Sequence, residues 1–224
     1  PTESEGLDLE FCNRQGVVHL GKAMFSIVKR QTVEERRVEI LETTCRVVIE
    51  RGFAGTRVAD VAQRLGVSNS LIHYHFESKE ALLAEAFSHY AKKSLQECVD
   101  YIVEAPTAQE QLARAIEDFV PEGSDDLEWM LWIDAWGEAL RNPLMRRISQ
   151  ELDVRSNELI EAILRKGNDE GDFSCVDPRM SAMRLMGLID GLAVQFAAHD
   201  GVLTRNDLID AVTRAAQQET THGK

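Results

Sequence analysis

The chain has 224 residues, of which 38 are acidic and 25 basic, so its formal net charge is −13. This length allows one large domain, or a small domain joined to a larger one. The four cysteines, Cys12, Cys45, Cys98 and Cys175, are far apart in the sequence, which indicates neither a disulfide framework nor a metal site. No apolar run is long enough to cross a bilayer. We therefore expect a cytoplasmic protein with no membrane association and no cofactor.

Apolar residues recur at helical spacing along most of the chain, and no segment alternates apolar and polar residues as a strand does. The sequence therefore predicts an all-α fold. Residues 1–32 are the exception, because their first ten positions are polar and acidic. We predict that these residues form a flexible N-terminal extension.

The first domain helix is predicted over residues 33–51. Thr32 can cap it, and Glu34 and Glu35 in its first turn favour the helix dipole. Its inner stripe is Leu41, Thr44, Cys45 and Val48.

Residues 56–79, TRVADVAQRLGVSNSLIHYHFESK, contain two short amphipathic helices joined by a glycine. We expect Thr56 to cap the first helix, Gly66 to end it in the left-handed conformation, and Ser68 to cap the second. The apolar stripe of the first helix is Val58, Val61, Ala62 and Leu65. Ser78 is expected to cap the next helix. This pattern is typical of a helix-turn-helix, and a tight corner in an ordinary helical protein is the alternative.

The second short helix has a polar outer face. Ile72 and Phe76, four residues apart, define its inner side, so Ser70 and Tyr74 lie opposite. None of the outer residues is acidic, which suits a helix in the major groove of DNA. The predicted DNA-binding residues are Thr56, Ser68, Asn69, Ser70, Leu71, His73, Tyr74 and Lys79.

Residues 36–87 resemble the DNA-binding domain of the TetR (tetracycline-repressor) family. The matching elements, in order, are Arg51-Gly52-Phe53, Gly55-Thr56, Val61-Ala62, Leu65-Gly66-Val67-Ser68, His73-Tyr74-His75-Phe76 and Ser78-Lys79-Glu80-Ala81-Leu82-Leu83. The run over residues 71–76 is more similar to the betaine-regulator-like branch of the family, and many members carry Tyr at the position of His73. The resemblance implies a helix-turn-helix DNA-binding domain over residues 33–80. It also implies an all-helical effector-binding and dimerisation domain over residues 81–224.

The helix after Ser78 is predicted to run toward Ala105, with a possible break near Lys92 and Lys93. Thr107 is expected to cap the following helix. Asp125 or Asp126 then begins a helix with all three tryptophans and Leu140 on one stripe. These tryptophans are read either as a plain core stripe or as the wall of a small-molecule pocket. The predicted effector-pocket residues are Trp129, Trp132, Trp136, Phe173 and Met183.

The next helix is predicted over residues 144–166, a turn over residues 167–171, and Phe173 is expected to fold back into the core. Asp177 begins a helix that is apolar nearly all round, which indicates burial on more than one side. Gly187 and Gly191, four residues apart, would allow another helix to approach closely. The predicted dimer-interface residues are Leu185, Leu188, Leu192 and Phe196.

The acidic excess does not argue against DNA binding, because it lies outside the helix-turn-helix. Residues 34–94 carry nine acidic and nine basic side chains, whereas residues 95–224 carry 25 acidic and 12 basic ones. We therefore predict a homodimeric, ligand-responsive regulator, a repressor that binds a pseudo-palindromic operator and is released by a small molecule. The alternative is a helical module whose corner binds a protein partner. An enzyme is not expected, since no nucleophile elbow or phosphate-binding loop is present.

Overall fold

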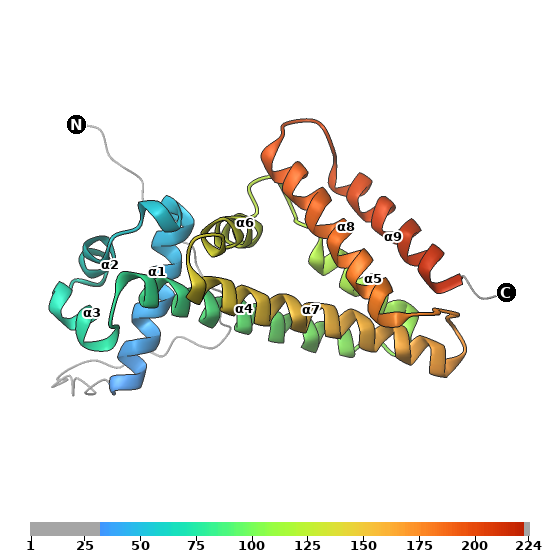
Figure 1. Ribbon diagram of the computed structural model, residues 1–224, viewed down its shortest axis with the longest axis horizontal. Coiled ribbons are helices and arrows are strands. Elements are labelled where there is room, and N and C mark those ends of the chain that lie inside the picture. The colour runs from blue at the N-terminus through green and yellow to red at the C-terminus, as the bar shows by residue number, and fades with distance from the viewer. Residues whose placement is uncertain (1–31, 222–224) are drawn as a thin grey trace, which may run out of the picture. The chain divides into compact units, whose positions relative to one another are not determined.

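The computed structural model describes residues 32–221. Helices joined by short loops are the only regular secondary structure in this part of the chain (Figure 1). The predicted all-α fold is thus confirmed. The predicted flexible extension lies outside the described residues except for Thr32. The helices of the described residues are α1 (Val33–Gly55), α2 (Val58–Leu65), α3 (Asn69–His75), α4 (Lys79–Val103), α5 (Ala108–Phe119), α6 (Leu127–Ala139), α7 (Pro143–Glu170), α8 (Pro178–Ala198) and α9 (Arg205–Thr221).

Most helices begin where a short polar side chain accepts backbone N–H groups, as the sequence predicts. Thr32 accepts from Glu35 N, and the Glu35 carboxylate accepts from Thr32 N, which completes a capping box. Of the two candidates before α6, Asp126 is the cap. The other caps predicted from sequence and found here are Ser68, Ser78, Thr107 and Asp177.

The predicted cap at Thr56 is wrong. Its side chain is 1% exposed, and its hydroxyl donates to the Gly52 carbonyl oxygen at 2.8 Å instead of accepting from α2. At the start of α2, the Asp60 carboxylate accepts from Arg57 N at 3.0 Å. The side chain of Thr56 therefore closes the end of α1 rather than the beginning of α2.

α1 contains a break at Gly52, whose φ is 71° and ψ 166°. This conformation is in the region that favours glycine, so a side chain here would strain the backbone. Phe53, directly after the break, is 2% exposed. The break therefore inserts Phe53 into the core and separates the end of α1 from its main body.

The helices enclose three hydrophobic clusters, and α4 contributes to all of them. Leu82 packs beneath α1, α2 and α3, and Phe87 packs with Phe53, Leu131 and α7. Ile102 packs among α5, α7, α8 and α9. α4 is one continuous helix, so the predicted break near Lys92 is wrong. α4 and α7 lie side by side, as do α8 and α9 (Figure 1).

The end of α7 differs from its predicted position. The helix continues through Gly167 and ends at Gly171, which has φ 81°. A Cβ atom on Gly167 would lie 2.0 Å from Cδ2 of Phe173, so only glycine leaves room for this ring. Phe173 thus folds back against the core as predicted. Within the described range, no helix has the length and hydropathy needed to cross a membrane. The domain boundary at residues 80/81 stays a prediction.

Candidate nucleic-acid interface and ligand cavity

The helix-turn-helix is held together by its inner residues. Gly66 has φ 67° and ends α2, and Ser68 accepts from Leu71 N at 3.3 Å to begin α3. Ile72 and Phe76 are 1% and 3% exposed, so the predicted inner side of α3 is confirmed. α3 has only seven residues, too few to be stable alone. Its position therefore depends on these two buried anchors.

The opposite face of α3 is open to solvent. Tyr74 is 74% exposed, its ring packs edge-on against His75, and α3 contains no acidic residue. The predicted contact residues that are exposed are Ser68, Asn69, Ser70, His73 and Tyr74. Leu71 and Lys79 are half-buried. Thr56 does not fit a side-chain contact to DNA, because it is buried and its hydroxyl is already bonded.

Several arginines near this unit are paired within the protein. Arg51 pairs with Asp60 at 2.8 Å. Arg37 donates to the carbonyl oxygen of His75, pairs with Glu85 and lies over the Phe76 ring. Arg37 thereby fixes the C-terminal end of α3.

Arg57, at the start of α2, is exposed and, unlike these arginines, forms no ion pair within the described part of the protein. The sequence reasoning missed it as a candidate phosphate contact. Its position directly before the apolar stripe of the first short helix is the signal that could have identified it.

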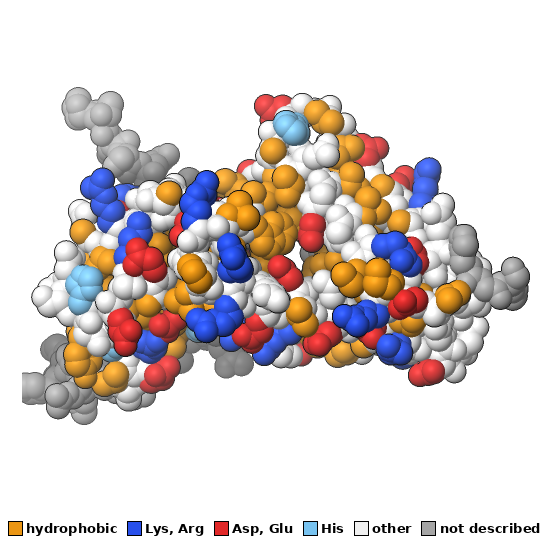
Figure 2. Space-filling model, in the orientation of Figure 1, with side chains coloured by type: hydrophobic (Ala, Val, Ile, Leu, Met, Phe, Trp, Pro, Cys, Tyr) orange, Lys and Arg blue, Asp and Glu red, His pale blue; other side chains and the backbone are white. Residues whose placement is uncertain are grey.

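A cavity of about 390 Å³ is lined by residues of α4, α5, α6, α7 and α8 and of the segment between α5 and α6. Its lining residues include Trp129, Trp132 and Trp136. Figure 2 shows hydrophobic side chains gathered between the positions of α6 and α8, with acidic side chains beside them.

Two predicted pocket residues are not part of this cavity. Phe173 packs against Gly167 and the core, and Met183 is 50% exposed on α8. Leu140, predicted on the tryptophan stripe, is 72% exposed at the end of α6. The reason is that residue 173 lies just after the end of α7, and residue 183 lies on an outward side of α8. Helical periodicity alone does not reveal either position.

The tryptophans form a continuous aromatic wall that is also part of the core. The Trp132 and Trp136 rings are 5.7 Å apart, and the Trp129 and Trp136 rings 6.1 Å apart. Trp132 also contacts Phe87 edge-on at 5.0 Å, and Phe87 contacts Phe53 at 6.2 Å. A chain of aromatic rings therefore connects the cavity with the break in α1.

Carboxylates that sequence reasoning missed face this wall. Burial raises the pKa of Glu128, whose carboxylate accepts a hydrogen bond from the Ser94 hydroxyl at 2.5 Å. Burial also raises the pKa of Asp153. Burial, together with the nearby charge of Asp153, raises the pKa of Asp190 to about 7. Glu128 lies four and eight residues before two of the tryptophans, and Asp190 interrupts an apolar helix; both patterns were visible in the sequence.

α6 is attached directly to the DNA-binding unit through Asp134. Its Oδ2 accepts from the backbone N of Phe53 at 2.6 Å, across 81 residues of sequence. The Cβ position of Gly52 is 3.1 Å from the same oxygen. The helix that carries the aromatic wall thus also holds the break in α1.

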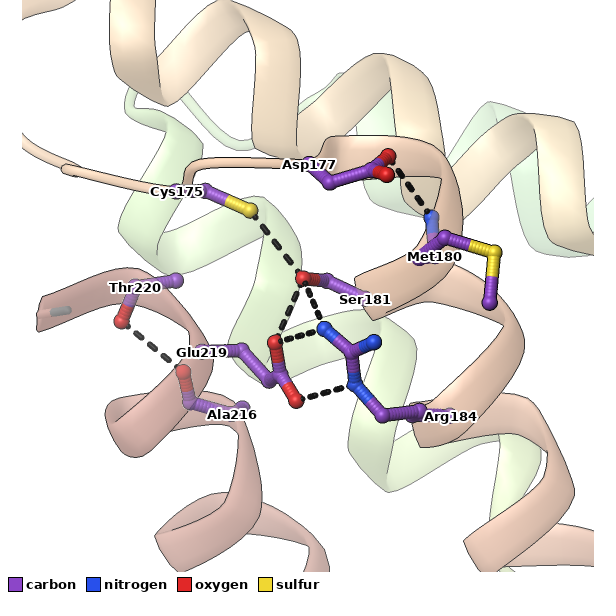
Figure 3. A network of polar contacts seen from close by, with 8 residues as sticks. All are labelled: Cys175, Asp177, Met180, Ser181, Arg184, Ala216, Glu219 and Thr220. Carbon is purple, nitrogen blue, oxygen red and sulfur yellow. Dashed lines mark hydrogen bonds and ion pairs between the residues drawn. The ribbon is translucent and has the colours of Figure 1, made fainter.

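α8 and α9 are joined by a polar network, shown in Figure 3. Arg184 on α8 donates to both carboxylate oxygens of Glu219 on α9, at 2.5 and 2.6 Å. Ser181 donates to Glu219 at 2.5 Å and accepts from Cys175. The network fixes the relative position of the two helices.

The four predicted interface residues of α8 differ in their exposure. Leu185 is 2% exposed and belongs to the protomer's own core. Leu188, Leu192 and Phe196 are half-buried and pack against that core. The exposed positions of α8 are Arg179, Met180, Met183, Arg184, Gly187, Gly191, Gln195 and Ala198. Leu185 is therefore not available to a partner, which the sequence does not reveal because a nearly all-apolar helix leaves its inner side undefined. An interface through Leu188, Leu192 and Phe196 stays a prediction.

Comparison with known families agrees with this architecture. Residues 40–86 match the family described as bacterial regulatory proteins, tetR family, and residues 108–221 match BetI-type transcriptional repressor, C-terminal. The chain belongs to the TetR family, with a BetI-type C-terminal domain. This TetR-family chain is a DNA-binding transcriptional repressor, as predicted. The family is not enzymatic, which agrees with the expected absence of catalysis.

Individual relatives support the family assignment. The HTH-type transcriptional regulator BetI of Paraburkholderia xenovorans is 28% identical over 192 residues, which cover 80% of this TetR-family chain and 94% of that protein. The regulator PksA of Bacillus subtilis is 28% identical over 182 residues, covering 80% and 86%. A transcriptional regulator from Saccharomonospora viridis, solved in complex with choline, is 31% identical with a TM-score of 0.76. That match covers 85% of this chain and all of the other.

Proposed function

We propose that this repressor is a homodimer that an organic cation releases from its operator. The observation that carries the proposal is a cavity that combines carboxylates with an aromatic wall on α6. The same helix is hydrogen-bonded to the break in α1. A cavity of about 390 Å³ lies within the usual range of about 300–1,000 Å³ for small-molecule sites.

The chemistry of the cavity favours a cationic ligand. Tryptophan faces attract quaternary ammonium groups through the ring quadrupole, most strongly where water is excluded. The partly buried carboxylates Glu128, Asp153 and Asp190 would neutralise the ligand charge. The complex of the Saccharomonospora viridis relative with choline supports the same ligand class for this chain.

The route from the cavity to DNA runs through α6. A ligand that displaces the tryptophan wall would move Asp134 and with it the Phe53 N–H. Trp132 would act in parallel on α4 through its contact with Phe87. Because α4 begins directly after the helix-turn-helix, both routes reach the orientation of α3. A ligand changes this orientation only if it binds the two arrangements with different affinity.

The proposed DNA contacts follow from the exposed face of α3. Asn69 and Ser70 are in its first turn, from which they would reach base edges, and Leu71 would contact a thymine methyl group. Tyr74 and His73 are proposed to bind phosphates. Ser68 and Lys79 are proposed to contribute near the starts of α3 and α4, where the helix dipole favours an anion. Arg57 is added to this set because of its exposure at the start of α2.

The proposed dimer forms through α8 and α9. Gly187 and Gly191 are exposed on α8, and a Cβ atom on either would meet nothing within 4 Å. Their backbone is therefore open to close approach by a second helix, here the same helix of a partner. Exposed Met180 and Met183 on α8 would add apolar contact area.

Operator release by matched small molecules tests the proposal. Operator DNA is first selected from a random pool, and its binding is then followed by fluorescence anisotropy at several salt concentrations. Choline is expected to lower operator affinity, whereas 3,3-dimethylbutan-1-ol, its neutral isostere, is not. Equal effects of the two compounds, or no effect of either, would contradict a cation-responsive repressor.

A further inference from the structure

The cavity contains more negative charge than one quaternary ammonium ligand can neutralise. Among the described residues that line it there is no Lys, Arg or His. The acidic lining residues are Glu97, Asp118, Glu122, Asp126, Glu128, Asp153 and Asp190. Glu97, Asp118 and Glu122 are exposed, and two of them pair with basic side chains, Glu97 with Lys93 and Glu122 with Arg205. The other four, Asp126, Glu128, Asp153 and Asp190, are half-buried and form no ion pair with a basic side chain in the described part of the protein. Partly buried carboxylates without basic partners are costly unless a ligand supplies the countercharge.

These carboxylates fall into two groups. Asp190 on α8 interacts with Asp153 on α7, while Glu128 interacts with Asp126 and Asp118. Trp136 partly offsets the raised pKa of Asp153, and Trp132 partly offsets that of Glu128. Since Glu128 and Trp136 are eight residues apart on α6, the two groups are separated by about 12 Å along the helix axis.

The first group contains an acceptor that lacks a donor. Oδ1 of Asn157, one turn after Asp153 on α7, is buried and accepts no hydrogen bond in the described part of the protein. The amide nitrogen of Asn157 is occupied, because it donates to the carbonyl oxygen of Asp153 at 2.8 Å. Asn157 lines the cavity together with Asp153 and Asp190. A buried acceptor there is satisfied by an N–H or O–H donor and not by a quaternary ammonium group.

The second group has fewer free positions. The Asp126 carboxylate accepts from the backbone N–H groups of Glu122, Glu128 and Trp129. Glu128 accepts from Ser94 and stands beside the tryptophan wall. This end suits a cation that offers apolar surface to the rings and needs few hydrogen bonds.

We infer that the cavity binds an elongated organic dication, with one cationic centre against Trp132 and Glu128. The other centre is a protonated amine held by Asp153, Asn157 and Asp190. The ligand class is that of aliphatic diamines and polyamines. Choline would bind more weakly, because it supplies only one of the two positive charges. The inference rests on the proposed function, because it takes this cavity as the effector site.

The test compares ligands that differ in one charge. Calorimetric titration of the full chain uses α,ω-diaminoalkanes from propane to octane, the matching 1-aminoalkanes and choline. The best diamine is expected to bind at least about tenfold more tightly than the monoamine of the same chain length, because a second desolvated ion pair contributes at least that factor. Equal affinities of diamine and monoamine would overturn the inference.

Variants locate the second charge. Asp190→Asn and Asn157→Leu are each expected to reduce the difference between diamine and monoamine. Glu158→Gln is the matched control, since Glu158 is an exposed carboxylate on α7 that does not line the cavity. A diamine advantage that survives in both cavity variants would also overturn the inference. Asn157→Leu serves as the second variant if Asp190→Asn does not fold.

The outcomes separate this inference from the proposed function. If choline releases the operator and diamines bind no better than monoamines, the dication assignment fails and the cation-responsive repressor stands. If no amine and no quaternary ammonium compound binds, both proposals fail.

Discussion

Replacing Asp134 by alanine should uncouple the ligand cavity from DNA binding. Asp134 is half-buried, and its Oδ2 accepts from Phe53 N at 2.6 Å. Hydrogen bonds to charged groups contribute about 1.5–3 kcal/mol, and we take the lower value because the carboxylate is partly exposed. A loss of about 1.5 kcal/mol lowers the Tm of a chain of this size by about 3–6 °C.

The decisive measurement is the ratio of operator Kd values with and without saturating choline. Coupling free energies between two sites are typically about 1–3 kcal/mol. Loss of about 1.5 kcal/mol from this contact reduces the ratio about tenfold. Asp134→Asn, which keeps an acceptor oxygen without the charge, should give an intermediate value.

Asp125→Asn is the control, because it removes one charge from an exposed residue just before α6. It should leave both the Tm and the ratio close to those of the unmodified chain. If Asp134→Ala lowers the Tm as expected but leaves the ratio unchanged, the contact only stabilises the fold and coupling takes another route.

Four further predictions concern the other surfaces. Tyr74→Ala should weaken operator binding by several-fold with no change in Tm; unchanged affinity in anisotropy titrations would show that Tyr74 does not contact DNA. Ser70→Ala should alter the sequence selected from a random pool more than the overall affinity, so an unchanged consensus would contradict base contact. Gly191→Leu should convert the dimer to monomer in analytical ultracentrifugation, whereas Gly137→Leu, at an equally open helical glycine on α6, should not; a dimeric Gly191→Leu protein would place the interface elsewhere. Because burial and Asp153 raise the pKa of Asp190 to about 7, its charged form increases with pH, and affinity for the best-binding diamine should rise up to about tenfold from about pH 6 to about pH 8. Asp190→Asn should reduce this rise in calorimetric titrations, and an unaltered pH profile would rule out Asp190 as its source.

The helix-turn-helix could be predicted from sequence because its determinants are local. Gly66, Ser68 and Ser78 each act on backbone groups within three or four residues, and the pair Ile72 and Phe76 fixes the inner side of a short helix. Signals of this kind need no knowledge of distant contacts. The predicted cap at Thr56 is wrong because its hydroxyl can either accept from the start of α2 or donate to the end of α1. The break at Gly52 favours the second, since it places the Gly52 carbonyl oxygen within reach.

The cavity and the coupling contact could be predicted only in part. The tryptophans were found because three aromatic residues on one stripe are conspicuous. Their carboxylate neighbours come from different helices, and helix packing, not periodicity, brings Asp153 and Asp190 together. The bond between Asp134 and Phe53 spans 81 residues and forms only because α1 is interrupted.

The charge distribution constrains how a cation can release DNA. The net charge of −13 arises after residue 94, and part of it lines the cavity. A bound cation makes this region less negative, which by electrostatics alone would strengthen binding to a polyanion. At physiological ionic strength, charge interactions are screened beyond about 8 Å, so this opposing effect is small. Release by a cation would therefore have to come from a change in helix position, and the contact between α6 and the break in α1 is the element suited to transmit it.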